Sequence, residues 1–232
     1  MRFSSYLFGG LLAATSLEAA TIGQVDNFED GTTKNWVINL LGMGSPPSPP
    51  TNVPTGGPAG MGDHFLRLTS TGVPNTAGSK LVAVQYQHQW TGNFIAAGIT
   101  AITMDVNNFG TTDLYLRVLF ADPMDAPPAN EAFSTTPIFL RAGSGWRSVI
   151  FPIGPSFLTA DAGTAIAALS NSTEFRIFNG SPTLAGPIIP TVAGVLGVDN
   201  IAASAVPEPA TFVLVGVGLV TMLAGVSRLK RS

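Results

Sequence analysis

The segment DLYLRVLF, Asp113 to Phe120, near the middle of the 232-residue chain, gives the clearest indication of the fold. Every second residue from Leu114 to Phe120 is large and apolar, whereas Tyr115 and Arg117 stand between them. Successive side chains of a β-strand point to opposite faces, so this alternation predicts a strand with one face on a core.

The middle of the chain repeats such short segments between turn residues. Its wealth of glycine and proline, 26 and 18 in the whole chain, disfavours long helices and favours strands joined by turns. Further strands are expected at residues 25–28, 36–39, 65–69, 81–87, 99–107, 137–141, 146–153, 174–179 and 196–202. The predicted fold is an all-β, two-sheet antiparallel β-sandwich, a jelly roll. Asp161 is expected to cap a short helix over 162–169, and the proline-rich residues 45–62 are expected to form a loop.

The N-terminal residues have the order of a secretory signal peptide. Arg2 supplies a positive start, an apolar run follows to Leu17, and the small residues Ala19 and Ala20 offer a cleavage site. The alternative is a buried N-terminal helix. A signal peptide over residues 1–20 is the favoured interpretation, and it makes the chain an exported protein.

The C-terminus has the pattern of a single transmembrane helix. Residues 210–226 carry no charge and are mostly apolar, and at about 1.5 Å per residue they extend roughly 25 Å. Arg228, Lys230 and Arg231 follow, and positive charge beside a membrane span stays on the cytoplasmic side. The sequence therefore predicts a membrane helix that holds the body of the chain outside, and a soluble core helix is the alternative.

The segment before this helix is an extended hinge, because Pro207 and Pro209 cannot continue a helix or a central strand. The order Pro207-Glu208-Pro209, apolar span and basic cluster resembles the PEP-CTERM sorting signal, over residues 206–232. The resemblance implies that the membrane enzyme exosortase recognises and cuts this tail, after an intermediate anchored in the inner membrane of a Gram-negative bacterium. It also implies delivery to the cell surface or the extracellular matrix.

Residues 21–205 remain as one domain. They hold seven basic and twelve acidic residues without a basic stripe, which argues against nucleic acid as a partner. The chain has no cysteine, so an exported domain of this sequence must be held together by its core or by a bound ion.

Three short motifs of this domain form a further pattern. They are residues 26–36, which begin DNFEDG, residues 145–153, GWRSVIFPI, and residues 197–201, GVDNI. The pattern resembles the galactose-binding-like jelly rolls that many non-catalytic carbohydrate-binding modules use. The resemblance implies a structural calcium ion that joins the first and last strands, with Glu29 and Asp199 as its best-matched ligands.

Residue types alone also point to calcium. This ion takes six to eight oxygen ligands from carboxylates, amides and backbone carbonyls. Acidic residues stand near both ends of the domain, and the first and last strands of a jelly roll can be neighbours. The predicted ligands are therefore Asp26, Glu29, Asp63 and Asp199. The alternative is that these acids lie in turns and cap strand ends.

A sugar-binding face is predicted in the segment QYQHQWTGN, which mixes aromatic and amide side chains. Aromatic rings stack on the apolar faces of sugars, while amides bond the hydroxyl groups. In a strand, Tyr86, His88 and Trp90 would share one face. Trp36 and Trp146 stand among apolar residues and are expected in the core, and a core position is the alternative for Trp90.

Catalytic motifs do not stand out. The chain has no cysteine nucleophile, its two histidines lack metal-ligand spacing, and no G-x-S-x-G elbow occurs. Scattered acids stand in no motif, namely Asp105, Asp113, Glu131 and Glu174. We interpret the protein as a non-catalytic surface or matrix protein associated with extracellular polysaccharide, in a carbohydrate-binding or structural role. The alternatives are a secreted glycan-cleaving enzyme with a β-sandwich fold and a protein–protein adhesion module.

Overall fold

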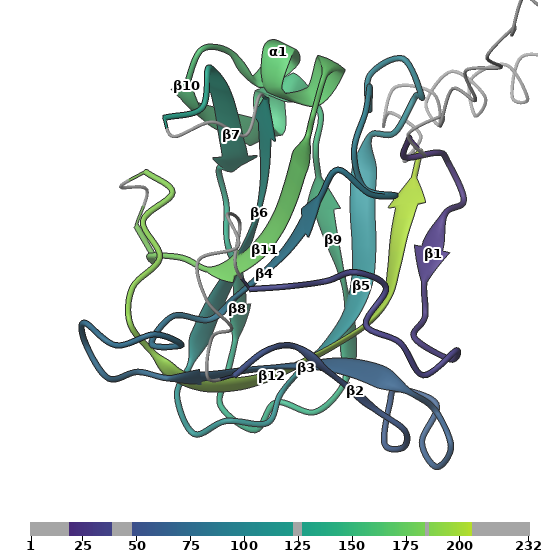
Figure 1. The fold of residues 1–232 in the computed structure, drawn as a ribbon, viewed down its shortest axis with the longest axis vertical. Coiled ribbons are helices and arrows are strands. Elements are labelled where there is room, and N and C mark those ends of the chain that lie inside the picture. Colours follow the sequence, from purple (N-terminus) through teal and green to yellow (C-terminus); the bar gives the residue numbers. More distant parts are fainter. Residues whose placement is uncertain (1–18, 39–47, 123–126, 184–185, 206–232) are drawn as a thin grey trace, which may run out of the picture.

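Two antiparallel β-sheets pack face to face in the computed structural model, so the predicted sandwich is confirmed (Figure 1). The structure describes residues 19–38, 48–122, 127–183 and 186–205. Nearly all of the predicted signal peptide and the whole predicted membrane helix lie outside these residues. Within the described ranges, no helix is long and apolar enough to cross a membrane.

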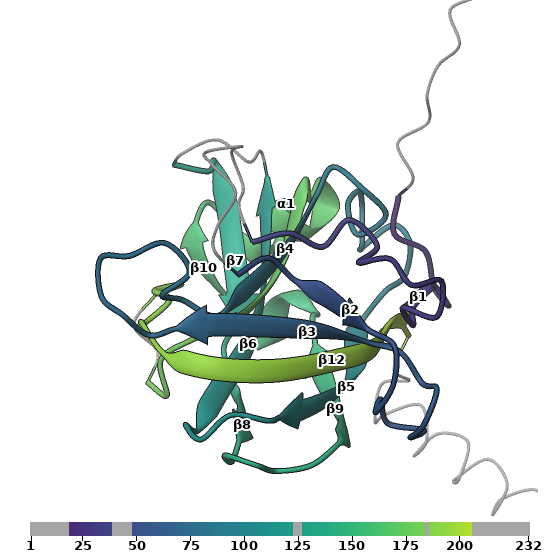
Figure 2. The ribbon, with the colours of Figure 1, turned by 60° about the horizontal axis from the view of Figure 1, so that its bottom comes forward.

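The first sheet has the last strand of the domain at its centre. Its strands, in spatial order, are β2 (Thr51–Val53), β3 (Phe65–Thr71), β12 (Ala193–Ser204), β5 (Ala101–Asn108) and β9 (Arg147–Pro152). β1 (Val25–Asp26) also pairs with β12, beyond the part that β3 occupies, so that Val25 lies opposite Ala202. The first and last strands of the domain are therefore neighbours, and Figure 2 shows β3 and β12 in front.

The second sheet has β6 at its centre. Its strands, in spatial order, are β10 (Leu158–Ala162), β7 (Asn130–Ser134), β6 (Leu114–Asp122), β11 (Glu174–Asn179) and β4 (Val82–Tyr86). β8 (Ile138–Leu140) pairs with the first half of β6, whose second half pairs with β7. A 3-10 turn, η1 (Pro155–Phe157), precedes β10, and a short helix, α1 (Ala165–Ser170), follows it.

The core lies between the sheets, as the alternation in β6 requires. Leu114, Leu116, Val118 and Phe120 are all fully buried. The ring of Phe120 stacks on that of Phe175 of β11, with centroids 5.1 Å apart. Each large apolar side chain buried in this way contributes about 1.5–3 kcal/mol, so the apolar face of β6 is a main support of the fold.

Some elements differ from the sequence-based expectation. β2, β7 and β10 are not predicted, and β2 lies inside the proline-rich segment expected to be a loop. The strand expected at 36–39 is reduced, in its described part, to an isolated bridge between Val37 and Val84. The predicted helix cap is wrong, because Asp161 belongs to β10. Thr164 caps α1 instead, and its hydroxyl accepts a backbone N–H of the first turn at 3.1 Å.

Candidate functional site

The predicted sugar-binding face does not form. β4 ends at Tyr86, and Gln87 has a φ of 53°, a left-handed conformation that interrupts the alternation of a strand. Tyr86 is half-buried and His88 is exposed, whereas Trp90 is fully buried. A common face for Tyr86, His88 and Trp90 is therefore wrong, and Trp90 occupies the core.

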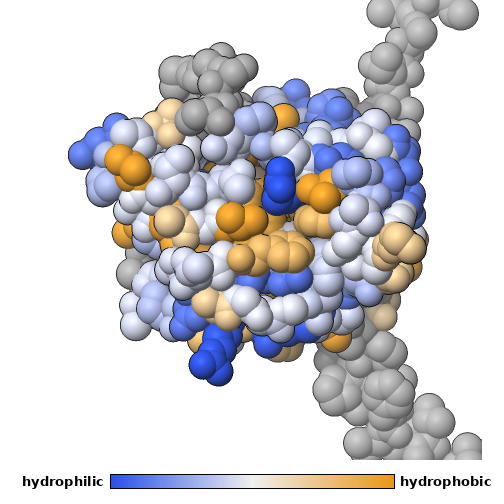
Figure 3. All heavy atoms as spheres, turned by 90° about the horizontal axis from the view of Figure 1, so that it is seen from below, coloured by the Kyte–Doolittle hydropathy of each residue, from blue (hydrophilic) through white to orange (hydrophobic). Residues whose placement is uncertain are grey.

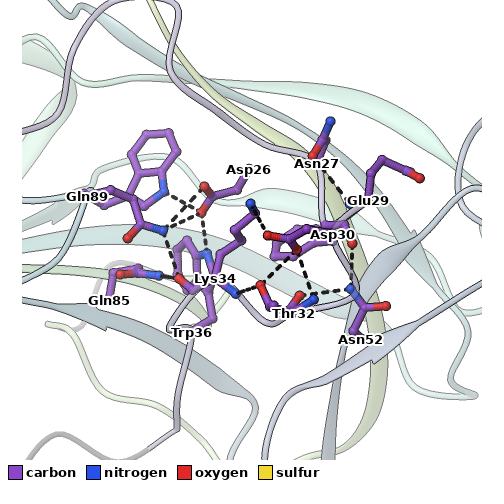
Figure 4. A network of polar contacts seen from close by, with 12 residues as sticks. Asp26, Asn27, Glu29, Asp30, Thr32, Lys34, Trp36, Asn52, Gln85 and Gln89 are labelled. Atoms are coloured by element: carbon purple, nitrogen blue, oxygen red, sulfur yellow. Dashed lines mark hydrogen bonds and ion pairs between the residues drawn. The ribbon is translucent and has the colours of Figure 1, made fainter.

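Trp90 instead bonds the buried carboxylate of Asp26, whose contacts with Trp36 and Gln89 are shown in Figure 4. Its indole N–H donates to Asp26 at 2.7 Å, and the indole N–H of Trp36, in the core as predicted, donates to the same oxygen at 2.8 Å. The Gln89 amide also donates to this oxygen, at 3.3 Å. Asp26 is 3 % exposed, and burial raises the pKa of its carboxyl although these donors oppose the shift. Asp26 thus ties β1 to the segment that follows β4.

An open pocket of about 780 Å³ adjoins this carboxylate and is lined by polar residues of the loop between β1 and β2. Lys34 forms an ion pair with Asp30 and lowers the pKa of that carboxyl to about 2. The Asn52 amide donates to the carbonyl of Thr32 at 2.9 Å and so braces the loop (Figure 4). The charges of Asp30 and Lys34 therefore neutralise each other.

Four carboxylates form an acidic cluster beside β12: Glu29, Asp63, Asp105 and Asp199. Asp199 is 1 % exposed, and its pKa is raised to about 7, first by burial and then by the charges of the other three. The backbone N–H of Asn200 donates to its carboxylate at 2.7 Å. The structure thus brings Glu29, Asp63 and Asp199, three of the predicted calcium ligands, near one another and adds Asp105.

The negative charge of the acidic cluster suits a cation, but its side chains do not point toward a common position. Glu29 and Asp63 each accept a backbone N–H, at 3.0 and 2.6 Å. Across the described part of the chain, no three acidic, histidine or cysteine side chains are arranged to hold a metal ion. Asp26, the fourth predicted ligand, stands apart, because its carboxylate faces the two indoles and is not among the charges that act on Asp199.

The second sheet presents a row of residues that the sequence alone does not reveal. Tyr86 of β4 lies opposite Glu174 of β11. Ala121 of β6 lies opposite Glu174 on one side and opposite Glu131 of β7 on the other. Paired residues share a face of a sheet, and this face turns away from the core, because Phe175, next to Glu174, belongs to the core. We call Tyr86, Glu174, Ala121 and Glu131 the carboxylate row.

The two acids of the carboxylate row differ in their partners. Glu174 is 1 % exposed and forms an ion pair with Arg176 at 2.6 Å, while burial raises its pKa. Glu131 is 8 % exposed, and its pKa is raised by burial and further by the charges of Glu174 and Asp161. The Glu131 carboxylate makes no hydrogen bond or ion pair with any residue of the described ranges. The row therefore combines a paired carboxylate with one that lacks a protein partner.

The rest of this face is covered by the chain itself. Leu119, Phe133 and Phe178 form a second apolar cluster together with Ala121, and Ile189 packs against it. The buried guanidinium of Arg117 donates to main-chain carbonyl oxygens at 2.8 and 3.2 Å. The carboxylate row therefore shares its sheet face with an apolar cluster and with the buried guanidinium of Arg117.

The outer face of the first sheet carries an aromatic cluster instead. Phe65, Phe109 and Trp146 contact one another, with ring centroids 5.6, 5.2 and 5.8 Å apart. They lie over Gly197, where a Cβ atom would approach the Phe109 ring to 2.7 Å. Trp146 is half-buried on this face, and its expected core position is wrong; its indole N–H donates to the carbonyl of Gly56 at 2.8 Å. Figure 3 shows apolar residues gathered in the middle of the face seen from below, bordered by hydrophilic ones.

One part of the carboxylate row can be predicted from the sequence. Glu174 and Arg176 stand two residues apart in a predicted strand, so their common face follows from the alternation. Glu131 depends on β7, which the sequence does not predict. The register that aligns Glu131 with Glu174 across Ala121 follows only from the paired strands.

The C-terminal tail matches a known family model. Residues 205–231 match the model described as the PEP-CTERM protein-sorting motif, which confirms the sorting motif predicted at Pro207, Glu208 and Pro209. Such a motif indicates an exported protein that is sorted to the cell surface. No curated protein matches the chain.

Solved structures resemble the sandwich. One, described as the solution structure, dynamics and binding studies of CtCBM11, is 14% identical, with a TM-score of 0.52 over 84% of this chain and 99% of that one. An exo-beta-agarase is 13% identical, with a TM-score of 0.51 over 78% of this chain and 24% of the enzyme. A family 11 carbohydrate-binding module from Clostridium thermocellum is 13% identical, with a TM-score of 0.49 over 82% and 98% of the two chains. The first of these shows that the chain has the jelly-roll fold of a carbohydrate-binding module.

Proposed function

We propose that this is a non-catalytic surface or matrix protein that binds an extracellular polysaccharide through the carboxylate row. The observation that carries the proposal is the alignment of Tyr86 with the ion pair of Glu174 and Arg176 on an outward sheet face. A tyrosine ring stacks on the apolar face of a sugar, and charged groups bond its hydroxyls. The fold of a carbohydrate-binding module supports the proposal.

Affinity electrophoresis in gels that contain the host's own exopolysaccharide tests this function. We expect the polysaccharide to retard the protein and Tyr86→Ala to weaken binding about three- to tenfold, because it removes the ring that stacks on the sugar. Tyr115→Ala is the matched control: Tyr115 is also half-buried, but it packs on Phe139 with ring centroids 5.3 Å apart, at the other end of β6. Equal losses in the two variants would remove Tyr86 from the site, and no retardation of any form would contradict binding.

Glycan cleavage is a second candidate, favoured by the two carboxylates of the row. Glu131 and Glu174 flank Ala121 on neighbouring strands, so their backbones lie about 10 Å apart at about 4.8 Å per strand. Inverting glycosidases hold two carboxyl groups about 6.5–9.5 Å apart, and the pKa of the acid is raised, as it is for both groups here. Release of reducing ends that Glu131→Gln abolishes would favour cleavage over binding.

The sorting motif supports a route to the surface. We infer that exosortase recognises the tail while residues 210–226 hold the chain in the inner membrane, and that a cut near Pro209 then passes the domain to the surface or the matrix. Mass spectrometry of the mature C-terminus tests this route. Intact residues beyond Pro209 in the mature protein would contradict it.

We also propose a structural calcium ion at the acidic cluster, which Glu29, Asp63 and Asp199 would bind after their carboxylates turn toward one another. What supports it is the Asp199 carboxyl, which is buried among three like charges. Calcium would supply the positive charge that these acids lack, with backbone carbonyls and water completing its oxygen shell. The ion would join the loop after β1 to β12, which already pairs with β1.

A further inference from the structure

We propose that the carboxylate row selects a polysaccharide with free amino groups, a partly de-N-acetylated aminoglycan, over neutral and uronic acid polymers. The inference rests on the proposed binding function and adds the chemistry of the ligand. It follows from the unequal pairing of Glu174 and Glu131, which face the same side of the second sheet.

Arg176, the basic residue beside the row, is committed to Glu174. Its Nε and Nη2 atoms both reach the same carboxylate oxygen of Glu174, at 2.7 and 2.6 Å. A guanidinium directed at one carboxylate in this way forms charge-assisted hydrogen bonds that are stronger than neutral ones. Arg176 therefore weakens the repulsion at the row but does not form an ion pair with Glu131.

The Glu131 carboxylate is the group that needs a cation. It is 8 % exposed, bonds no residue within the described parts of the chain, and is repelled by Glu174 and Asp161. Arg117 lies on the same face, but its guanidinium donates to main-chain carbonyls. A buried carboxylate without a partner is unfavourable, so a cation from the ligand would stabilise both the carboxylate and the complex.

Glu131 is the member of the acidic pair that a ligand can reach. Ala121, which lies between Glu131 and Glu174, is fully buried, and Glu174 is 1 % exposed. A sugar ammonium has three N–H donors to offer to the Glu131 carboxylate. An N-acetylated nitrogen offers one uncharged N–H, and a uronate would add a negative charge beside Glu131, Glu174 and Asp161. The row therefore favours the free amine over both alternatives.

The proposal is tested by comparing binding to one polymer with its amino groups free and with the same groups acetylated. The purified full-length protein is run in native gels that contain glycol chitosan, the same glycol chitosan after complete N-acetylation, or polygalacturonate. We expect the amine polymer to retard the protein and the acetylated polymer to bind about tenfold more weakly, as for the loss of a hydrogen bond to a charged group. Polygalacturonate is expected to cause no retardation.

Matched variants separate recognition from the general attraction of an acidic protein to a cationic polymer. Glu131→Gln keeps the shape but removes the charge, and should weaken binding to the amine polymer about tenfold. Asp113→Asn removes one charge from an exposed residue before β6, at the end far from the row, and should change nothing. Asp161→Asn, at an exposed residue that acts on Glu131, should give a smaller loss, and it replaces Glu131→Gln if melting curves show that variant to be unfolded.

The outcomes separate this inference from the proposed function. Equal binding of the amine and acetylated polymers would overturn the preference for amines but leave polysaccharide binding in place. Equal losses in Glu131→Gln and Asp113→Asn would overturn it too, because they would show general charge attraction. Failure of every polymer to retard the protein, the host's own polysaccharide included, would contradict the binding function itself.

Discussion

Asp26 and Asp199 are both buried aspartates on paired strands of the first sheet, yet they are stabilised in different ways. Asp26 on β1 accepts N–H groups from Trp36, Trp90 and Gln89. Asp199 on β12 accepts hydrogen bonds from its neighbour Asn200 and lies among three other acids. Burial raises the pKa of both carboxyls, but like charges add to the shift only at Asp199.

Burial alone therefore does not decide the role of a carboxylate. The protein supplies donors for Asp26 from three side chains, so this residue completes the fold without any added ion. At Asp199 the protein supplies more negative charge, which leaves the site complementary to a cation.

The largest effect is expected from Asp26→Ala. The change leaves the indole N–H groups of Trp36 and Trp90 buried without an acceptor, at a cost of about 1–3 kcal/mol each. For a domain of this size the melting temperature should fall by roughly 5–20 °C. Denaturant unfolding with tryptophan fluorescence measures the loss, and an unchanged midpoint would show that Asp26 does not tie the two segments.

Calcium should have the next largest effect. At a hundredfold excess over its dissociation constant, a bound ion adds about 2.7 kcal/mol, or roughly 5–10 °C in the melting temperature. Asp199→Asn should abolish most of this gain, whereas Asp26→Asn should keep it. Thermal melts in calcium and in a chelator measure the shift. Identical melting temperatures of the wild type in calcium and in chelator would refute the calcium proposal.

The same substitution should have opposite signs at the two positions when calcium is chelated. Asp199→Asn removes a buried charge that faces three acids, so the variant should be more stable than the wild type by on the order of 1 kcal/mol. Asp26→Asn turns an amide N–H₂ toward the Gln89 donor in place of Oδ1, so that variant should be less stable. Chemical unfolding of both variants in chelator measures the two changes in stability, and changes of the same sign would contradict the proposed difference between Asp26 and Asp199.

The smallest effect is a difference in pH dependence between the wild type and Asp26→Asn, measured at constant calcium. The pKa of Asp26 is raised in the folded state, so its contribution to stability is full below the unfolded pKa. That contribution is lost as the pH rises through the raised pKa. The wild type should therefore lose stability relative to Asp26→Asn as the pH rises from about 3 to 7. Parallel pH profiles of unfolding would contradict the raised pKa.

Much of the fold could be predicted from the sequence, because its strands alternate clearly. The apolar side chains of β6 that the pattern assigns to one face are all buried in the core. The acidic cluster could also be predicted, because the jelly roll makes the first and last strands neighbours and so brings Glu29 near Asp199. Local patterns and the neighbours that a known fold implies were sufficient for these features.

The features that the sequence did not predict depend on contacts between residues far apart in the chain. The burial of Trp90 follows from the turn at Gln87 and from an acceptor 64 residues away, Asp26. No local pattern contains that pair. The carboxylate row required the register of three strands, one of them the unpredicted β7 that carries Glu131. Trp146 lies on an outer face because the glycine at 197 leaves room for its ring there, and a run of apolar neighbours cannot show this.

The pairing of β1 with β12 also decides how the domain would be tethered. Val25 lies opposite Ala202, so the two ends of the sandwich leave it side by side, from the sheet that does not carry Glu131 and Glu174. β12 runs to Ser204, and the sorting motif begins one residue later, with no spacer between them. In the proposed anchored intermediate, the sandwich would be held close to its anchor by one sheet, while Glu131 and Glu174 lie on the other.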